Sequence, residues 1–162
     1  MRSAAIYPLI VVLAFAGCGA DGGNAGADEG GAEAHQRSAS ESARKHTRIV
    51  LRSSDYGRML FDSKRQAIYV FQRDRKNKTN CYGECAEAWP PVFTDGRPTA
   101  GKGVNSSRLG TIKRRDGRRQ VTYAGRPLYY YAHEGTGEVE CHNVYLNGGF
   151  WWAIGPDGKR LR

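Results

Sequence analysis

The sequence predicts a single small all-β domain built from two repeats, carried outside the cell on a lipid anchor and a tether. Three observations support this prediction. A set of aromatic, acidic and cysteine residues recurs in the same order about sixty residues further on. Short β-prone runs alternate with turn signals. The first eighteen residues have the form of an export signal that ends in a cysteine.

The N-terminal segment predicts export followed by lipidation. Arg2 precedes an apolar run that ends at Ala16, which is shorter than the roughly 20 residues of a permanent membrane span and is typical of a secretory signal. The run closes with Ala16-Gly17-Cys18, the small-small-Cys pattern of lipoprotein processing sites. We expect residues 1–17 to be removed and Cys18 to carry a diacylglycerol, because two acyl chains such as palmitate give stable anchoring. The alternative is an ordinary signal peptide with an incidental cysteine.

Residues 18–47 are expected to form the lipidated cysteine and a disordered tether. After Cys18 this segment contains Gly, Ala, Ser and acids, with no aromatic residue and no apolar periodicity. Such a composition cannot bury enough surface to offset the entropy of ordering. About 29 flexible residues reach roughly 30 Å, which clears a lipid headgroup layer. The expected location is therefore extracytoplasmic, with the chain lipid-anchored to the cell membrane.

The remaining residues, 48–162, form one domain with a positive surface. They contain 15 of the 17 aromatic residues, and 21 Lys and Arg against 11 Asp and Glu. This excess favours anionic lipid or a wall polymer as a partner, and the alternative is an Arg-rich solvated surface. The basic run 113–119 is expected at a hairpin tip, with too few aromatic residues for a nucleic-acid platform. We therefore expect no specific nucleic acid, and the protein partner is unknown.

The repeat is defined by a Tyr-x-aromatic-x-x-acid motif. Its copies occupy residues 69–74 and 129–134, and each is followed by a cysteine and then by a Trp-led run ending in Asp-Gly. The two repeats, called the first and second copies below, span about 48–97 and 109–160. The matching residues are Tyr69 and Tyr129, Phe71 and Tyr131, Asp74 and Glu134, Cys81 and Cys141, and Trp89 and Trp151.

Each copy is expected to contain about three strands, a cysteine-bearing loop and a Trp-led strand. β-prone runs separated by Asp-Gly and Gly-x-Pro turns indicate antiparallel meanders. One copy alone would leave a half-buried face open, so two are expected to pack around a pseudo-twofold axis. A short helical turn is expected near 81–89, because its Ala and Glu residues favour helix and Pro90 ends it. The strands are expected at 49–51, 59–61 and 68–71, and at 109–113, 121–123 and 128–131.

The motif acids are expected to organise loops. Each acid falls at the end of a strand, where a carboxylate can accept N–H groups of the loop that follows. Ligand binding and acid catalysis are the alternatives. The sequence contains no Gly-rich phosphate loop, His-Glu-x-x-His or Gly-x-Ser-x-Gly motif, so no catalytic residue is predicted. The motif residues given this organising role are Tyr69, Phe71, Asp74, Tyr129, Tyr131 and Glu134.

The domain cysteines Cys81, Cys85 and Cys141 are candidates for a disulfide. Outside the cytosol thiols tend to oxidise, and three leave one unpaired. Cys81 can reach Cys85 if the turn brings their Cα atoms within roughly 7 Å, whereas a bond to Cys141 would join equivalent positions of the two copies. The spacing leaves both pairings open. The alternative is a soft-metal site that adds His142, because thiolate and imidazole suit copper or zinc. Otherwise no cofactor is expected besides the lipid.

The motif strings resemble a known family. The two motifs, the string 80–91 and the string 121–129 are similar to the bacterial secreted-repeat lipoproteins, predicted lipoproteins defined by a Tyr-x-aromatic-x-x-Asp motif. The resemblance covers roughly residues 59–159, and the second motif departs from it by ending in Glu134. In this family the pair equivalent to Cys81 and Cys85 commonly stands alone, which implies that these two bond to each other. The resemblance implies location and repeat architecture, and no established reaction.

The expected function is that of a membrane-anchored extracytoplasmic lipoprotein acting as a non-catalytic envelope binding or scaffolding module. Its aromatic strand faces and basic rim are the expected contact surfaces. The alternative is a redox or soft-metal-binding envelope protein that uses the domain cysteines and His142. An enzyme is the third class considered.

Overall fold

The computed structural model describes residues 46–162, so the expected signal peptide, Cys18 and nearly all of the tether lie outside the described residues. The described part is nearly all β, which confirms the predicted class. Within it, no helix is long and apolar enough to cross a membrane. The elements are β1 (Arg48–Ser54), β2 (Gly57–Asp62), β3 (Tyr69–Phe71), α2 (Glu84–Ala88), β4 (Thr99–Ala100), η1 (Ser106–Arg108), β5 (Leu109–Lys113), β6 (Arg119–Tyr123), β7 (Arg126–Pro127), β8 (Val144–Leu146) and β9 (Gly149–Ala153).

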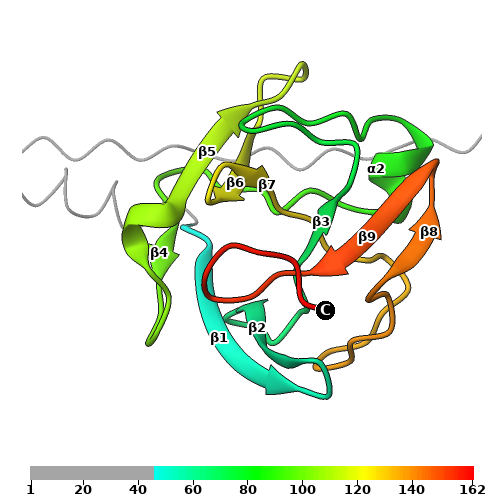
Figure 1. Ribbon diagram of the computed structural model, residues 1–162. Coiled ribbons are helices and arrows are strands. Elements are labelled where there is room, and N and C mark those ends of the chain that lie inside the picture. The colour runs from blue at the N-terminus through cyan, green and yellow to red at the C-terminus, as the bar shows by residue number, and fades with distance from the viewer. Residues whose placement is uncertain (1–45) are drawn as a thin grey trace, which may run out of the picture.

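The strands form three small sheets, ordered β2-β1-β4, β3-β9-β8 and β5-β6-β7. Each copy opens with an antiparallel hairpin, β1–β2 or β5–β6, and β3 and β9 lie near the centre of the molecule (Figure 1). Both hairpins turn at a glycine with positive φ, Gly57 at 100° and Gly117 at 82°, a conformation that glycine adopts without steric cost. The short β4 differs from the predicted meander, because it pairs parallel with β1.

The two copies exchange their Trp-led strands. β9 belongs to the second copy, yet it pairs antiparallel with β3 of the first copy. The Trp-led run of the first copy likewise lies against the second motif. The second copy therefore supplies strands to the sheet of β3, and the first copy pairs with the second through isolated bridges at Pro91 and Phe93. The matching contacts are Tyr69 opposite Ala153, Tyr129 opposite Pro91, and the hydrogen bonds from Leu60 N to Ile154 O and from Val121 N to Val92 O.

The motif tyrosines mark the pseudo-twofold axis. The backbone N–H of Tyr69 donates to the carbonyl of Tyr129 at 2.9 Å, and that of Tyr129 donates to the carbonyl of Tyr69 at 3.0 Å. Beside them the indoles of Trp89 and Trp151 stack with centroids 3.8 Å apart and planes 3° apart. Reciprocal contacts between equivalent residues arise from a twofold relation, which confirms the predicted arrangement.

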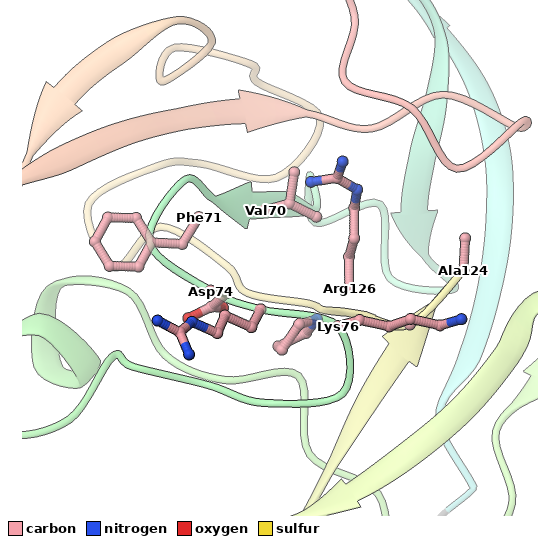
Figure 2. Close-up of a pocket in the computed structure, with 9 residues that line it drawn as sticks. Val70, Phe71, Asp74, Lys76, Ala124 and Arg126 are labelled. Carbon is pink, nitrogen blue, oxygen red and sulfur yellow. The ribbon is translucent and has the colours of Figure 1, made fainter.

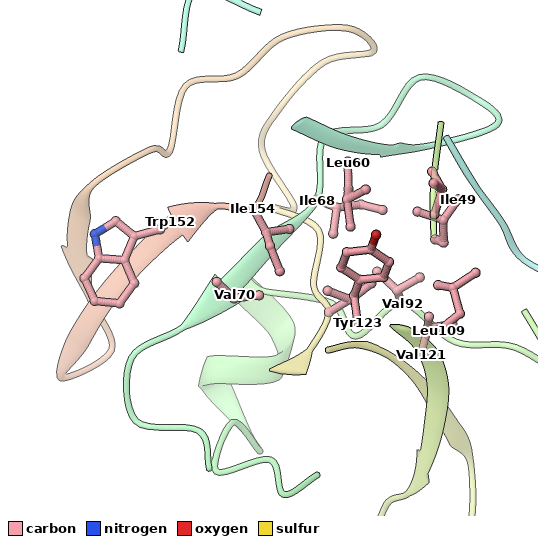
Figure 3. Close-up of a cluster of buried hydrophobic side chains, with 12 residues drawn as sticks. Ile49, Leu60, Ile68, Val70, Val92, Leu109, Val121, Tyr123, Trp152 and Ile154 are labelled. Carbon is pink, nitrogen blue, oxygen red and sulfur yellow. The ribbon is translucent and has the colours of Figure 1, made fainter. Parts of the chain in front are cut away.

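Two hydrophobic clusters fill the interior. One is largely aliphatic around Tyr123 and reaches Val70 and Trp152 (Figure 3). The other is rich in aromatic side chains, including Trp89 and Trp151, which are fully buried. Phe71 stacks on Trp151 with ring centroids 4.2 Å apart. Its counterpart Tyr131 has its ring centroid 4.7 Å from that of Trp89. The aromatic cluster therefore lies where the two copies meet, and it positions both motif acids at its edge.

Candidate functional site

The two motifs are joined by a pair of crossed hydrogen bonds. The hydroxyl of Tyr69 donates to Glu134 Oε1 at 2.5 Å, and the hydroxyl of Tyr129 donates to Asp74 Oδ2 at 2.6 Å. Each motif therefore supplies the tyrosine that binds the acid of the other motif. The sequence places these residues in matching positions, but it does not show that each tyrosine binds the acid of the other copy.

Each motif acid also holds the loop that follows it. Asp74 Oδ1 accepts from the backbone N–H of Asn80 at 2.7 Å, and Glu134 Oε1 accepts from the backbone N–H of Glu140 at 2.5 Å. In both copies the donor lies six residues after the acid. This is the geometry of a carboxylate that fixes a loop, and it occupies both acids with bonds inside the fold.

Burial sets the protonation of these groups. It raises the pKa of Asp74 to about 6, although hydrogen bonds from Tyr129 and Asn80 and the charge of Arg114 act in the opposite direction. Burial also raises the pKa of Glu134 above its ordinary value. The pKa values of Tyr69 and Tyr129 are raised first by burial and then by the adjacent carboxylates, so both hydroxyls remain protonated donors.

A buried arginine distinguishes the surroundings of Asp74. Arg114 is 5% exposed, and its guanidinium donates to Gln120 Oε1 and to the carbonyl of Cys81, both at 2.7 Å, and to Thr79 Oγ1 at 3.3 Å. The Thr79 hydroxyl in turn lies 2.6 Å from the hydroxyl of Tyr129. The side chain ties the β5–β6 hairpin to the cysteine loop.

Sequence reasoning missed this role, because it treated the run 113–119 as a charged hairpin tip. The available signal was strand alternation. Arg114 lies two residues after the half-buried Ile112 and so points to the same face.

The cysteines form one disulfide inside the first copy. Cys81 and Cys85 are bonded with an S–S distance of 2.02 Å and Cα atoms 5.3 Å apart, which is the pairing that the family resemblance implied. The bond connects the loop to α2, the predicted helical turn, which ends at Ala88 with Trp89 as its C-cap, just before Pro90. Cys141 is buried and free.

The alternative soft-metal site of Cys81, Cys85, Cys141 and His142 is not formed. The sulfurs of Cys81 and Cys85 are bonded to each other, and burial raises the pKa of the Cys141 thiol to about 11, which disfavours the thiolate. His142 Nδ1 accepts from the backbone N–H of Ala153 at 3.2 Å. Residues 46–162 contain no group of three or more His, Cys, Asp or Glu placed to hold a metal ion.

A pocket of about 290 Å³ opens next to the first motif acid (Figure 2). Its floor includes the buried side chains of Val70 and Phe71. Three exposed cationic residues line it, Arg75 and Lys76 from the loop after the motif and Arg126 from β7. We call these three residues the cationic rim. An apolar floor with a positive rim suits an anion that carries an apolar face.

Three aromatic side chains line the outer face of the β8–β9 hairpin. Tyr145 is directly opposite Phe150 in the register, with ring centroids 5.1 Å apart, and Phe150 lies 5.8 Å from Trp152 with nearly parallel planes. We call Tyr145, Phe150 and Trp152 the aromatic ladder. Their exposure rises outward from 8% at Trp152 through 36% at Phe150 to 62% at Tyr145. The ladder therefore extends the buried aliphatic cluster into solvent.

These features define a class of protein, a duplicated all-β repeat domain whose two copies are joined by reciprocal tyrosine–carboxylate bonds. A family model described as a secreted repeat of unknown function matches residues 50–93 and 110–154. The chain belongs to this family of secreted repeats, and its domain is extracytoplasmic. The comparisons with curated proteins and with solved structures gave no significant match.

Proposed function

We propose that the protein is a lipid-anchored binding module of the cell envelope that performs no catalysis. The observation that carries this proposal is the use of the motif side chains within the fold. Both acids accept a tyrosine hydroxyl from the other copy and an N–H from their own loop. The most distinctive polar groups of the family motif are therefore committed to holding the two copies together.

The surface supports a role in binding anionic partners. The domain carries 21 Lys and Arg against 11 Asp and Glu, and three of these cationic residues line one pocket. Clustered positive charge raises the local concentration of anions and speeds their association. Polymers and lipids of the cell envelope are the anions that an extracytoplasmic domain meets at high density.

The proposed anchor rests on the sequence Ala16-Gly17-Cys18 after a short apolar run. A diacylglycerol on Cys18 would hold the domain at the membrane surface, because two acyl chains give stable anchoring. Replacing Cys18 with Ser is expected to release the protein from the membrane fraction. Cell fractionation after a high-salt wash tests this, with Cys141→Ser as the matched control that keeps the anchor. Retention of the Cys18→Ser variant in the washed membrane pellet would contradict the anchor.

The binding role is tested with the same released chain. The full-length Cys18→Ser protein is expected to sediment with isolated cell-envelope fragments at low salt and to be released as salt rises, because the contact is largely electrostatic. An unrelated protein of similar size and charge is the control for nonspecific adsorption. Sedimentation no greater than that of the control would contradict the proposed function.

A further inference from the structure

The two copies provide an internal control for function. A feature present in both copies at equivalent positions is explained by the shared fold. A feature that one copy carries and the other lacks is not required by that fold. The aromatic ladder is of this second kind. The cationic rim combines Arg75 and Lys76 of the first copy with Arg126 of the second, and the matching positions of the two copies carry no cations.

The rim cations are an addition to a backbone that both copies share. In the first copy the N–H of Asn77 donates to the carbonyl of Gly125 at 2.7 Å, and in the second the N–H of Gly137 donates to the carbonyl of Arg65 at 2.9 Å. Each loop is thus held to the turn before a motif in the same way. At the positions of Arg75, Lys76 and Arg126, however, the other copy has Gly135, Thr136 and Gln66.

The ladder lies entirely in the second copy. The positions of Tyr145, Phe150 and Trp152 correspond to Cys85, Ala88 and Pro90 in the first copy. Where the first copy has the disulfide-closed helix α2, the second copy has the β8–β9 hairpin. This hairpin presents its aromatic rings to solvent. Residues at least a third exposed, as Tyr145 and Phe150 are, add little to the core and are available for a ligand.

The pocket and the ladder are connected through one face of the β3–β9–β8 sheet. Val70, which lines the pocket, is directly opposite Trp152 in the β3–β9 register, so both side chains lie on one face of the sheet. Trp152 is two residues from Phe150 and shares that face. The guanidinium of Arg160 lies over the Trp152 ring, 4.5 Å from its centroid. A ligand seated in the pocket would therefore continue along the ladder.

The charges of the pocket call for an anionic group. The carboxylate of Asp74 also lines the pocket, but its oxygens already accept from Tyr129 and Asn80. Three cationic side chains line this one pocket, so an anion bound there is attracted by all three. Arginine is suited to carboxylate and phosphate because its planar guanidinium can donate two parallel hydrogen bonds.

We propose that the cationic rim and the aromatic ladder together bind an anionic glycan. A carboxylate or phosphate group of the glycan occupies the pocket, and its sugar rings lie against the aromatic faces. This proposal rests on the proposed function and names the substrate class of that binding module. A chain of rings with regularly spaced charges fits a linear surface that begins in a cationic pocket and continues as a row of aromatic rings.

The geometry favours a glycan over a bilayer surface. The cationic residues line a concave pocket, whereas a bilayer presents its headgroups in a plane. The aromatic side chains lie along the face of the hairpin, and the tip between its strands is Asn147-Gly148. A hairpin that inserts into lipid would present an apolar tip. The ladder is instead placed for lateral stacking.

The experiment measures binding of defined probes to the full-length Cys18→Ser protein by calorimetry. Tetragalacturonic acid is expected to bind, and neutral maltotetraose at least about tenfold more weakly, since one lost charge-assisted contact is worth about this factor. Inorganic phosphate is expected to compete for the pocket. Vesicles of phosphatidylglycerol in phosphatidylcholine are expected to bind more weakly than the charged glycan at the same charge concentration. Preferential binding of the vesicles would overturn the proposal.

Matched variants locate the site. Replacing Arg75, Lys76 and Arg126 with Gln is expected to weaken tetragalacturonate binding at least about tenfold. The control removes three exposed cations elsewhere, Arg52, Lys64 and Lys102, and is expected to change affinity less than about threefold. Equal losses in the two variants would show a diffuse charge effect and overturn the assigned site, while envelope sedimentation of the parent protein would still support the proposed function.

The ladder has its own matched pair. Tyr145→Ala is expected to weaken tetragalacturonate binding about three- to tenfold, by analogy with the contribution of other ring-stacking contacts. Tyr56→Ala removes an aromatic residue of 41% exposure that lies outside the ladder, and is expected to leave binding unchanged. Both residues are exposed, so a shared thermal midpoint is expected. Unchanged binding by folded Tyr145→Ala would exclude the ladder from the site.

Discussion

The connections from motif acid to tryptophan solve the same problem differently in the two copies. In the first copy a loop and the short α2 are closed by the Cys81–Cys85 disulfide. In the second, the position of Cys85 is Tyr145, and the β8–β9 hairpin makes the connection without a covalent bond. Both connections end at a tryptophan beside the pseudo-twofold axis, where the ring centroids of Trp89 and Trp151 are 3.8 Å apart. The fold therefore requires the stacked tryptophans and tolerates different structures in the connection that precedes them.

The two motif acids also differ in the polar groups that surround them. Asp74 and its tyrosine are linked to Thr79 and to the buried Arg114. Glu134 has the corresponding tyrosine bond, but its Oε2 atom is buried and accepts no hydrogen bond from residues 46–162. The crossed tyrosine–carboxylate pair is common to both copies, and the link through Thr79 to a buried arginine is found only beside Asp74. The comparison separates what holds the copies together from what each copy has added.

Separating the copies is the most severe test of this comparison. A fragment of residues 46–104 and one of residues 105–162 are each expected to be unfolded, because each has given its Trp-led strand to the other. Mixing the two fragments is expected to restore β structure. Circular dichroism and NMR shift dispersion of each fragment and of the mixture measure this. A single fragment with a dispersed, native-like spectrum would contradict the exchanged pairing.

The stacked tryptophans are expected to be equally important. Trp89→Ala and Trp151→Ala should each lower the free energy of unfolding by about 3–5 kcal/mol, the usual cost of emptying a fully buried aromatic site. Urea denaturation of the two variants gives the comparison, with the exposed Tyr145→Ala as a control near zero. A difference of more than about 2 kcal/mol between the two tryptophan variants would show that the axis is not energetically symmetric.

The cysteines should differ according to copy. Replacing Cys81 and Cys85 together with Ala is expected to cost about 2 kcal/mol, the value for cross-linking so short a loop. Cys141→Ala removes only a buried thiol and is expected to cost about 1 kcal/mol. Denaturation with and without a reductant measures both variants. The Cys141→Ala protein is expected to lose stability on reduction as the parent does, and an insensitivity of this variant to reductant would point to a bond involving Cys141.

The pH dependence of stability should reveal Asp74. Its folded-state pKa of about 6 exceeds the ordinary value of 3.8, so the protonated form favours folding. This contribution is complete below pH 4 and is lost as the pH rises through about 6. Relative to Asp74→Asn, the parent protein is expected to lose about 1–2 kcal/mol between pH 4 and pH 7.

The groups that face Asp74 in this measurement are the Tyr129 hydroxyl, the Asn80 N–H and the Arg114 guanidinium. Glu134→Gln is the matched variant in the second copy, and burial of Glu134 gives a contribution of the same sign. Burial lowers the pKa of His142, which acts in the opposite direction as the pH falls. A parent protein whose pH profile parallels that of Asp74→Asn would contradict the raised pKa.

Local sequence signals predicted much of the fold. The recurrence of the motif located both copies, and Pro90 after a run of Ala and Glu located α2. The hairpins β1–β2 and β5–β6 lie where β-prone runs and turn residues placed them. Each of these features is determined by residues that are close together in the sequence, so local patterns are enough to predict them.

The exchange of strands could not be predicted in this way. Tyr69 pairs with Ala153 across more than half of the chain, and a strand pattern states which residues pair only when the turn between them is short. The same limit applies to the crossed bonds between Tyr69 and Glu134 and between Tyr129 and Asp74. The burial of Arg114 was not predicted, because the positive charge of the run 113–119 indicated an exposed hairpin tip and the alternation of the strand was not applied to it. The cationic rim was also missed, since its members come together only in three dimensions.

The exchanged strands have a consequence for how such a chain can diverge. A single copy that gave its Trp-led strand to an identical partner would make every contact twice, as a homodimer does. Any substitution would then appear on both sides of the axis at once. Joining two copies in one polypeptide replaces that association with an intramolecular one at high effective concentration. It also lets equivalent positions mutate independently, so one of the two equivalent pockets can gain cations from both copies, and one copy can gain a disulfide, while the matching positions keep only the shared scaffold.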